Sequence, residues 1–280
     1  HQYRFAAAES VEKDKIPKAI SIILLGGIVS AFMGPGIANY AKDIVGEHLY
    51  VGSYLALGIL TIIPTIFFLF YKNTSKLESN IKYSGRSRLE LISQPRFLQA
   101  LVASAFGYAI MTFLMTATPL SMHVMEKMSL SKTGLVIQFH VVAMFLPSLV
   151  TGYLIKKFGH SNIMYAGVFL YSITIAASFF DQTFFNYMFA LIFLGLGWNF
   201  LFISGTSLLV LTYKEDEKFR AQGLNDFIVY SVHAIGSLSA GVLIALTNWK
   251  TMNIICIPLM VLIILTTLRA EILSKKNPDN

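Results

Sequence analysis

The chain has 280 residues, of which 55% are hydrophobic and only 13% are charged. So few charges cannot solvate the surface of a water-soluble protein of this size, and the composition therefore argues against a soluble globular fold. The net charge of +7 is compatible with nucleic acid or anionic lipid as a partner, so the positions of the charges must decide. Cys256 is the single cysteine, so no disulfide can form within the chain.

Eight apolar segments follow one another along the chain, each long enough to cross a bilayer. About 20 helical residues span the hydrocarbon core, and inside lipid every backbone N–H and C=O must be bonded within the protein. We therefore predict helices over residues 19–40, 51–71, 97–120, 133–155, 162–180, 185–211, 223–246 and 250–268. Residues 1–8 have the character of the end of a further helix, which suggests a piece of a longer protein. The predicted fold class is all-α: a polytopic membrane protein with eight complete transmembrane helices plus the end of another.

The basic residues fall almost entirely on one side of these predicted helices. When the loops are placed alternately on two sides, one side holds seventeen Lys and Arg and the other holds four, with Arg4 left out. Basic residues in short loops stay in the cytoplasm, so we predict that the C-terminus is cytoplasmic. A nucleic-acid partner would need a basic face with stacking aromatic side chains. Because the charges lie at helix ends instead, we predict a lipid bilayer and no nucleic acid.

The longest polar loop divides the predicted helices into two groups. We assign residues 1–71 to the end of an N-terminal helix bundle, 72–95 to a central cytoplasmic loop, 96–270 to a C-terminal six-helix bundle and 271–280 to a cytoplasmic tail. Pro95 suits the first turn of the following helix, where a backbone N–H would have no partner.

The first complete helix carries a row of small residues. Residues four apart lie on one helical face, and small side chains let two backbones approach closely in lipid. A proline within this row weakens the helix. We predict a tight, bendable seam between two halves of the protein, with ordinary helix packing as the alternative. The seam residues are Gly26, Ser30, Gly34, Pro35 and Ala38.

Three cationic or titratable residues lie within or beside apolar segments. His140 and His233 are candidates for proton coupling, because intramembrane ionisable residues mark ion paths and histidine titrates near physiological pH. The alternative is a neutral histidine bonded to a neighbouring helix. Arg4 is the third candidate: it would bind an anion or relay proton coupling by shifting the pKa of a carboxylate. The alternative is that it extends its charge to the membrane surface.

Two lysines mark the end of the segment over residues 133–155. Lys156 and Lys157 can complement the free carbonyls of a helix C-terminus. Alternatively they form a cytoplasmic gate with acids such as Asp226 or Glu217. We expect Asp226 in the first turn of its helix, where the dipole also favours a carboxylate, so a helix-start role competes with gating.

Several of these stretches resemble the major facilitator superfamily. Residues 26–39 resemble the glycine-proline signature of the fifth helix in its drug–proton antiporter branch. Residues 152–160 resemble the loop motif after the eighth helix, although Lys156 stands where that motif often has an aspartate. Residues 197–202 and 222–227 are similar to a pattern around the tenth and eleventh helices. The resemblance implies a bacterial transporter of two helix bundles, with this chain running from the end of the fourth helix to the C-terminus.

The resemblance also implies which helices line a central substrate cavity. One side of the segment 97–120, together with the middle of 185–211, would face it. The implied cavity residues are Tyr108, Met111, Thr112, Met115, Thr116, Trp198 and Asn199. Helix packing is the alternative for the Met and Tyr side chains, whereas an amide in lipid needs a partner.

No catalytic or metal-binding pattern stands out in the sequence, since neither a Walker-type loop nor a Cys/His ligand spacing occurs. We therefore predict a protein that is not an enzyme and has no cofactor and no metal. The predicted function is secondary active transport of a small organic molecule across the bacterial inner membrane by alternating access, with proton-coupled export as the first interpretation. Proton-coupled uptake of a nutrient or metabolite and a non-transporting receptor or scaffold are the alternatives.

Overall fold

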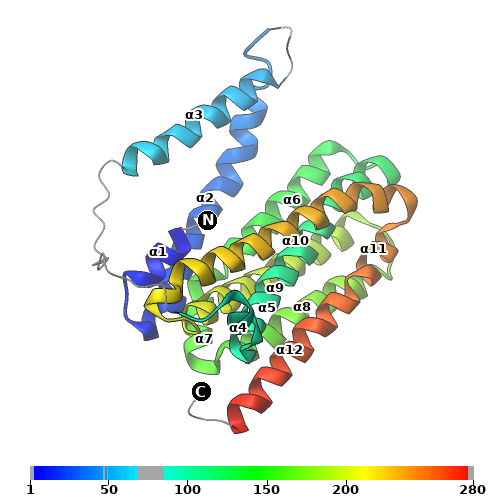
Figure 1. Cartoon of the computed structure of the whole chain (residues 1–280). Coiled ribbons are helices and arrows are strands. Elements are labelled where there is room, and N and C mark those ends of the chain that lie inside the picture. The colour runs from blue at the N-terminus through cyan, green and yellow to red at the C-terminus, as the bar shows by residue number, and fades with distance from the viewer. Residues whose placement is uncertain (1–2, 47, 49, 69–84, 277–280) are drawn as a thin grey trace. The chain divides into compact units, whose positions relative to one another are not determined.

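The computed structural model describes residues 3–46, 48, 50–68 and 85–276, with the side chains of Pro35 and Asn39 left out. Each of the eight predicted segments is mostly helical within these ranges, and the all-α class is confirmed (Figure 1). The chain divides into two compact units: unit 1, residues 1–25 and 82–280, and unit 2, residues 26–81.

Unit 2 is a helical hairpin. It contains the later part of α2 (Ile16–Ala41) and all of α3 (Val51–Phe68). Ser53 Oγ donates a hydrogen bond of 2.6 Å to the Ala38 carbonyl, which ties the two helices together. A Cβ on Gly52 would lie 2.0 Å from the Ala41 carbonyl oxygen, so only glycine permits this close approach. Residues 69–71 of the predicted second span lie outside the described residues.

Unit 1 contains the rest of the described chain. Between its longer helices lie the short turns η1 (Lys13–Lys15), η2 (Leu120–Met125) and η3 (Glu215–Glu217). Its helices are the start of α2, α1 (Tyr3–Glu9), α4 (Arg88–Ser93), α5 (Pro95–Pro119), α6 (Leu130–Phe145), α7 (Ser148–Phe158), α8 (His160–Ala177), α9 (Phe184–Val210), α10 (Lys218–Leu246), α11 (Trp249–Ile255) and α12 (Ile257–Lys276).

α5 and α9 form the core of unit 1. In the most apolar 18-residue stretch of each helix, 78% of the residues are buried in α5 and 72% in α9. The corresponding share in α10 is only 17%. α9 packs on α5, α6 and α8, and α5 packs on α10 and α12. Small residues allow this contact: a Cβ on Gly205 of α9 would lie 2.8 Å from the Ala100 carbonyl oxygen of α5. The facing sides of α5 and α9 therefore form much of the buried interior of this unit.

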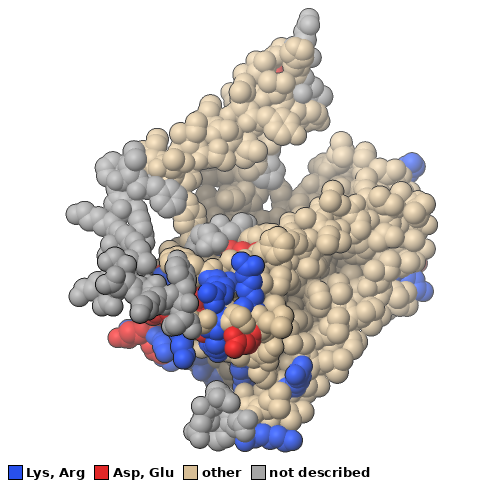
Figure 2. Space-filling model, viewed as in Figure 1, with Lys and Arg blue, Asp and Glu red and all other residues tan. Residues whose placement is uncertain are grey.

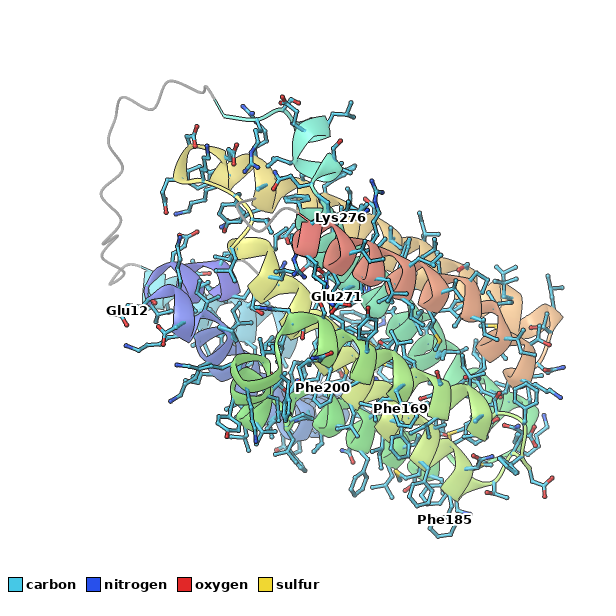
Figure 3. The ribbon with its side chains drawn as sticks, turned by 90° about the horizontal axis from the view of Figure 1, so that it is seen from below. Glu12, Phe169, Phe185, Phe200, Glu271 and Lys276 are labelled. Carbon is cyan, nitrogen blue, oxygen red and sulfur yellow. The ribbon has the colours of Figure 1, made fainter. Side chains whose placement is uncertain are left out.

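The outer surface of unit 1 is apolar. Among the described residues, six helical stretches are long and apolar enough to cross a membrane. Phe169 and Phe185 point away from the bundle and are 66% and 67% exposed (Figure 3). Charged side chains gather at one end of the visible face of unit 1 and are sparse along its flank (Figure 2). Apolar flanks of this extent suit lipid and not water.

Two of the predicted helices are interrupted near prolines, and a third is followed directly by an irregular turn. Pro119 precedes the π-type turn η2, Pro147 lies between α6 and α7, and Pro258 stands near the start of α12 after the break at Cys256. Proline removes a backbone donor and crowds the carbonyl four residues earlier, so the regular bonding pattern ends there. Apolar length alone predicts the membrane segments, but it does not show these breaks.

Two helix boundaries differ from the predicted ones by five residues or more, and one short helix was not predicted. α10 begins at Lys218 and not at residue 223, and α12 continues to Lys276, so the first residues of the predicted tail are helical. α4 occupies part of the predicted central loop. The expectation that Asp226 lies in a first turn is therefore wrong: it lies eight residues beyond Lys218, about 12 Å along the axis.

Candidate functional site

A buried ion pair joins α1 to α10. Arg4 is 2% exposed and Asp226 is 8% exposed. Arg4 Nη2 donates a hydrogen bond to Asp226 Oδ1, and Arg4 Nη1 donates to the Tyr230 hydroxyl at 3.2 Å. A buried charge needs a partner of opposite sign, and each residue supplies that partner for the other. Arg4 therefore does not extend to the membrane surface.

The same arginine packs on aromatic rings. Its guanidinium carbon lies 4.5 Å from the ring centre of Phe5 and 5.0 Å from that of Phe202. A cation over an aromatic face is stabilised by the ring quadrupole. Phe202 lies on α9, so Arg4 links α1 both to α9 and to α10.

Next to this ion pair lies a group of rings that we call the aromatic cluster. It consists of Tyr108 of α5, Phe145 of α6, Trp198 and Phe202 of α9, and Tyr230 and His233 of α10. Trp198 and Phe202, four residues apart on one helical face, stack with ring centres 4.9 Å apart and an interplanar angle of 11°. Tyr108 meets these two rings edge-on, at 5.5 and 5.4 Å.

The aromatic cluster also contains polar groups. His233 Nδ1 lies 2.7 Å from Thr112 Oγ1, within hydrogen-bond distance, and its ring is edge-on to Tyr108 at 4.6 Å. Trp198 Nε1 is buried and has no hydrogen-bond partner among the described residues. A buried N–H without an acceptor is unfavourable, so this donor is suited to an acceptor supplied from outside the chain.

The predicted cavity side of α5 divides between two environments. Tyr108 and Thr112 belong to or contact the aromatic cluster, whereas Met111 is 2% exposed and part of the hydrophobic core. Met115 and Thr116 are partly exposed. Core packing, the alternative given for methionine, therefore describes Met111.

Asn199 follows Trp198 in the sequence but has different surroundings. Its Nδ2 donates to the Met144 carbonyl at 2.6 Å and to Ser148 Oγ at 2.8 Å. Thr151 Oγ1 donates to its Oδ1 at 2.6 Å. These partners lie on both sides of the α6–α7 break. Asn199 thus bonds the Met144 carbonyl at the break in the helix near Pro147. None of these bonds reaches the aromatic cluster.

The other intramembrane histidine is fully buried. His140 Nδ1 donates to the Leu191 carbonyl of α9 at 2.7 Å. Its exposed fraction is 0%, and Nε2 has no hydrogen-bond partner in the described part of the chain. This geometry matches the alternative of a neutral histidine bonded to a neighbouring helix.

We call the end of unit 1 where most charged side chains gather its basic end (Figure 2). Lys218 Nζ lies 2.5 Å from Glu9 Oε2, and Gln222 Nε2 donates to Glu9 Oε1 at 2.8 Å. Lys156 Nζ lies 2.9 Å from Asp14 Oδ2. A Cβ on Gly152 would lie 2.8 Å from Lys18 Cα. These contacts bring α1 and the start of α2 against α10 and α7.

The acid partners at this end differ from the expected ones. Lys156 pairs with Asp14 and not with Asp226 or Glu217, and Lys157 Nζ lies 5.1 Å from the ring centre of its neighbour Phe158. Sequence reasoning did not single out Glu9 and Asp14, since charged loop residues are ordinary at helix ends.

Glu217 is instead held by the segment before α4. Arg86 Nε and Nη2 donate to its two carboxylate oxygens at 2.6 and 2.5 Å. This hydrogen-bonded carboxylate raises the pKa of the Arg86 guanidinium. A two-point pair of this kind has a defined geometry, so it fixes the end of the central loop on the start of α10.

The predicted seam lies in unit 2. Gly26, Ser30, Gly34 and Ala38 are exposed on α2, and the side chain of Pro35 is outside the described residues. The seam stays a prediction. Within the described ranges, no group of three His, Cys, Asp or Glu side chains is placed to hold a metal ion.

Comparison with known proteins gives the class of the protein. The model of the Major Facilitator Superfamily matches residues 111–279. The chain belongs to this superfamily, and the polytopic membrane fold follows from that membership. The narrower drug–proton antiporter branch stays a prediction.

Two curated relatives match most of the chain. The chain is 38% identical over 266 residues to the riboflavin transporter RfnT of Brucella anthropi. This match covers 94% of this chain and 66% of that protein. The chain is 27% identical over 271 residues to the uncharacterized MFS-type transporter YddS of Bacillus subtilis. This match covers 90% of this chain and 62% of that protein. The chain thus spans about two thirds of each relative's length.

One solved structure supports the fold. The crystal structure of a bacterial homologue of the iron transporter ferroportin, in an outward-facing state, has a TM-score of 0.67 and 14% sequence identity. The match covers 95% of this chain and 66% of that one. At this identity the likeness concerns the fold alone.

Proposed function

We propose that the chain is part of a secondary transporter that binds a flat heteroaromatic solute against the aromatic cluster. The observation that carries this proposal is the unpartnered Trp198 N–H within a set of stacked and edge-on rings. Aromatic rings favour offset-stacked or edge-on contact with another ring, and the indole N–H adds a donor for a ring acceptor.

The relative named a riboflavin transporter supports a more specific substrate. Riboflavin has a flat, fused-ring system with carbonyl and ring-nitrogen acceptors. Trp198 and Phe202 are 2% and 1% exposed, so the aromatic cluster must open before such a ring can stack beside them and accept a hydrogen bond from Trp198 Nε1. Riboflavin, or a compound with a similar ring, is the substrate that we propose.

We assign proton coupling to the Arg4–Asp226 pair and to its neighbour His233. Protonation of Asp226 removes the negative charge that holds Arg4 and would weaken one of the contacts between α1 and α10. Because Arg4 also packs on Phe202, a change at the ion pair reaches the aromatic cluster directly. His140 takes no part in this coupling scheme.

We further propose that the basic end faces the cytoplasm of the bacterial inner membrane. The excess of basic residues supports this orientation. The contacts of Glu9 with Lys218 and of Asp14 with Lys156 would then close the cytoplasmic side while the opposite side is open. Loss of these contacts would open the inner side, as alternating access requires.

Radiolabelled riboflavin flux in vesicles tests the proposal. The protein that carries this chain should move riboflavin against its concentration gradient when a pH gradient is imposed. Outward movement would support the predicted export, and inward movement would support the uptake alternative. No flux of riboflavin or of other flat heteroaromatic compounds would refute the proposal and favour a scaffold.

The two tryptophans of the chain provide a matched pair of variants. Trp198→Leu should raise the riboflavin KM by up to about tenfold, because an aromatic pair contributes about 0.5–1.5 kcal/mol beyond its buried area. Trp249→Leu removes an equally buried indole outside the aromatic cluster and should leave KM unchanged. Equal effects on KM would contradict the assignment of the binding surface.

A further inference from the structure

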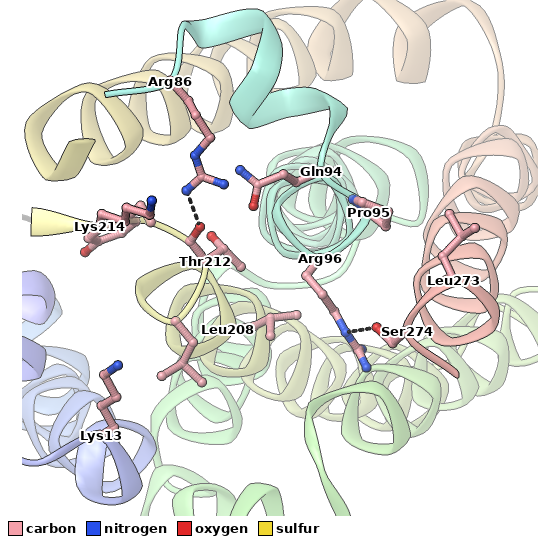
Figure 4. A pocket seen from close by; sticks show the side chains of 12 residues that line it. Lys13, Arg86, Gln94, Pro95, Arg96, Leu208, Thr212, Lys214, Leu273 and Ser274 are labelled. Carbon is pink, nitrogen blue, oxygen red and sulfur yellow. Dashed lines mark hydrogen bonds between the residues drawn. The ribbon is translucent and has the colours of Figure 1, made fainter. Parts of the chain in front are cut away.

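A cavity of about 770 Å³ lies at the basic end of unit 1, away from the aromatic cluster (Figure 4). The start of α5, the end of α9 with the segment after it, and the end of α12 surround it. Four of the side chains that line it are basic, and the described lining residues include no acid. The basic lining residues are Lys13, Arg86, Arg96 and Lys214.

Arg96 is the most constrained of these four side chains. Its Nε donates to Ser274 Oγ at 3.0 Å, and its Nη1 donates to Gln99 Oε1 at 3.0 Å and to Ser161 Oγ at 3.3 Å. All three partners are neutral. They orient the guanidinium across the cavity toward α12 without cancelling its charge (Figure 4).

Two of the remaining charges are also uncompensated. Arg86 pairs with Glu217, whereas Lys13 and Lys214 form no ion pair among the described residues. The cavity therefore collects three basic side chains that no described carboxylate neutralises. Like charges around one space repel each other, so an anion would stabilise the arrangement.

The cavity supplies donors besides the charges. Gln94 lines it, and the buried Nε2 of this residue has no partner in the described part of the structure. A guanidinium oriented by neutral hydrogen bonds presents its free donors in a fixed fork, which matches phosphate oxygens. Leu208, Leu211 and Leu273 add an apolar wall beside these donors.

We propose that this cavity binds a phosphate group, with Arg96 as the principal ligand and Lys13 and Lys214 as supporting charges. The group belongs either to the headgroup of an anionic phospholipid or to a soluble phosphate compound. The apolar wall and the position between helix ends suit a lipid, since basic pockets between transmembrane helices bind anionic headgroups. This site is independent of the proposed transport substrate.

The test measures binding to the purified full-length protein in phosphate-free detergent buffer. Phosphatidylglycerol and inorganic phosphate are titrated separately, and saturable rises in the thermal unfolding midpoint give each apparent dissociation constant. Saturation by the lipid at concentrations where inorganic phosphate has no effect supports the headgroup as the source. Saturation by inorganic phosphate alone supports a soluble compound.

Charge-removing variants then locate the site. Arg96→Gln should weaken binding about fivefold or more, and Lys13→Gln/Lys214→Gln should weaken it about fivefold for each charge removed. The double variant changes only exposed side chains, so it keeps the test valid if Arg96→Gln does not fold. The control Arg269→Gln/Lys276→Gln removes two exposed charges from α12 that do not line the cavity.

Two results would contradict the proposed phosphate site, one from the control variant and one from the titrations. Equal weakening in the control would mean general attraction of anions to a basic surface and would overturn the proposal. A midpoint that does not respond saturably to either probe would overturn it as well.

Discussion

Unit 1 holds two polar groups at the core that differ in chemical character. Arg4 and Asp226 form a charged pair beside the aromatic cluster, and the charge of the carboxylate can be removed by a proton. Asn199 joins the Met144 carbonyl, Ser148 and Thr151 through neutral hydrogen bonds. The first group contains charged side chains, whereas the second contains only neutral ones. The comparison separates the group to which we assign proton coupling from one that maintains a break in a helix.

The largest effect is expected from removing the charge of Asp226. Asp226→Asn leaves Arg4 buried without a counter-charge, and breaking a buried pair in this way costs about 3–5 kcal/mol. We expect a clearly lower thermal unfolding midpoint and loss of pH-gradient-driven flux. Calorimetry of the purified protein and vesicle flux measure the two effects.

Two further variants check this expectation. Asp181→Asn neutralises an exposed acid and should change neither quantity. Arg4→Gln/Asp226→Asn removes both charges and should recover part of the stability without restoring coupling. Normal gradient-driven flux in Asp226→Asn would show that the pair has only a structural role.

A substitution in the neutral group around Asn199 should change the stability of the protein and not its transport. Asn199→Ala removes the donor to the Met144 carbonyl and to Ser148 Oγ, at about 1–3 kcal/mol for a buried group left unsatisfied, while the Thr151 hydroxyl keeps its bond to the Pro147 carbonyl. The unfolding midpoint should fall, while the dependence of flux on the pH gradient should be unchanged. Asn162→Ala, which removes an exposed asparagine that donates a hydrogen bond to the Phe158 carbonyl of its own turn, is the control. A changed pH dependence in Asn199→Ala would erase the distinction between the two groups.

The sequence predicts much of the fold because lipid imposes a simple rule. A long apolar segment must be helical, and each of the eight predicted segments is mostly helical within the described residues. The depth of Asp226 was mispredicted for a related reason. The first turn and a half of α10, from Lys218 to Gln222, is mostly polar, so hydropathy does not assign it to the helix. Helices that continue beyond the apolar core are invisible to this rule.

The site was less predictable because partners are distant in sequence. Arg4 and Asp226 are separated by 222 positions, and no pattern along the chain relates them. Trp198 and Asn199 are consecutive, yet neighbouring helical residues point about 100° apart, so one meets the aromatic cluster and the other the α6–α7 break. The sequence indicates that both lie within the bundle. Only the packing of α6, α7 and α9 decides which surface each one meets.

The smallest expected effect concerns His233 of the aromatic cluster, whose ring centre lies 6.5 Å from that of Tyr230, a hydrogen-bond partner of Arg4. His233→Gln keeps a polar side chain but alters the hydrogen bond to Thr112, and a single bond of this kind is worth about 0.5–1.5 kcal/mol. We expect the unfolding midpoint to change little and gradient-driven riboflavin accumulation to fall up to about tenfold. His123→Gln changes an exposed histidine outside the aromatic cluster and should preserve accumulation. If His140→Gln reduced accumulation more than His233→Gln at equal stability, proton coupling would belong to the fully buried histidine and not to the group around Asp226.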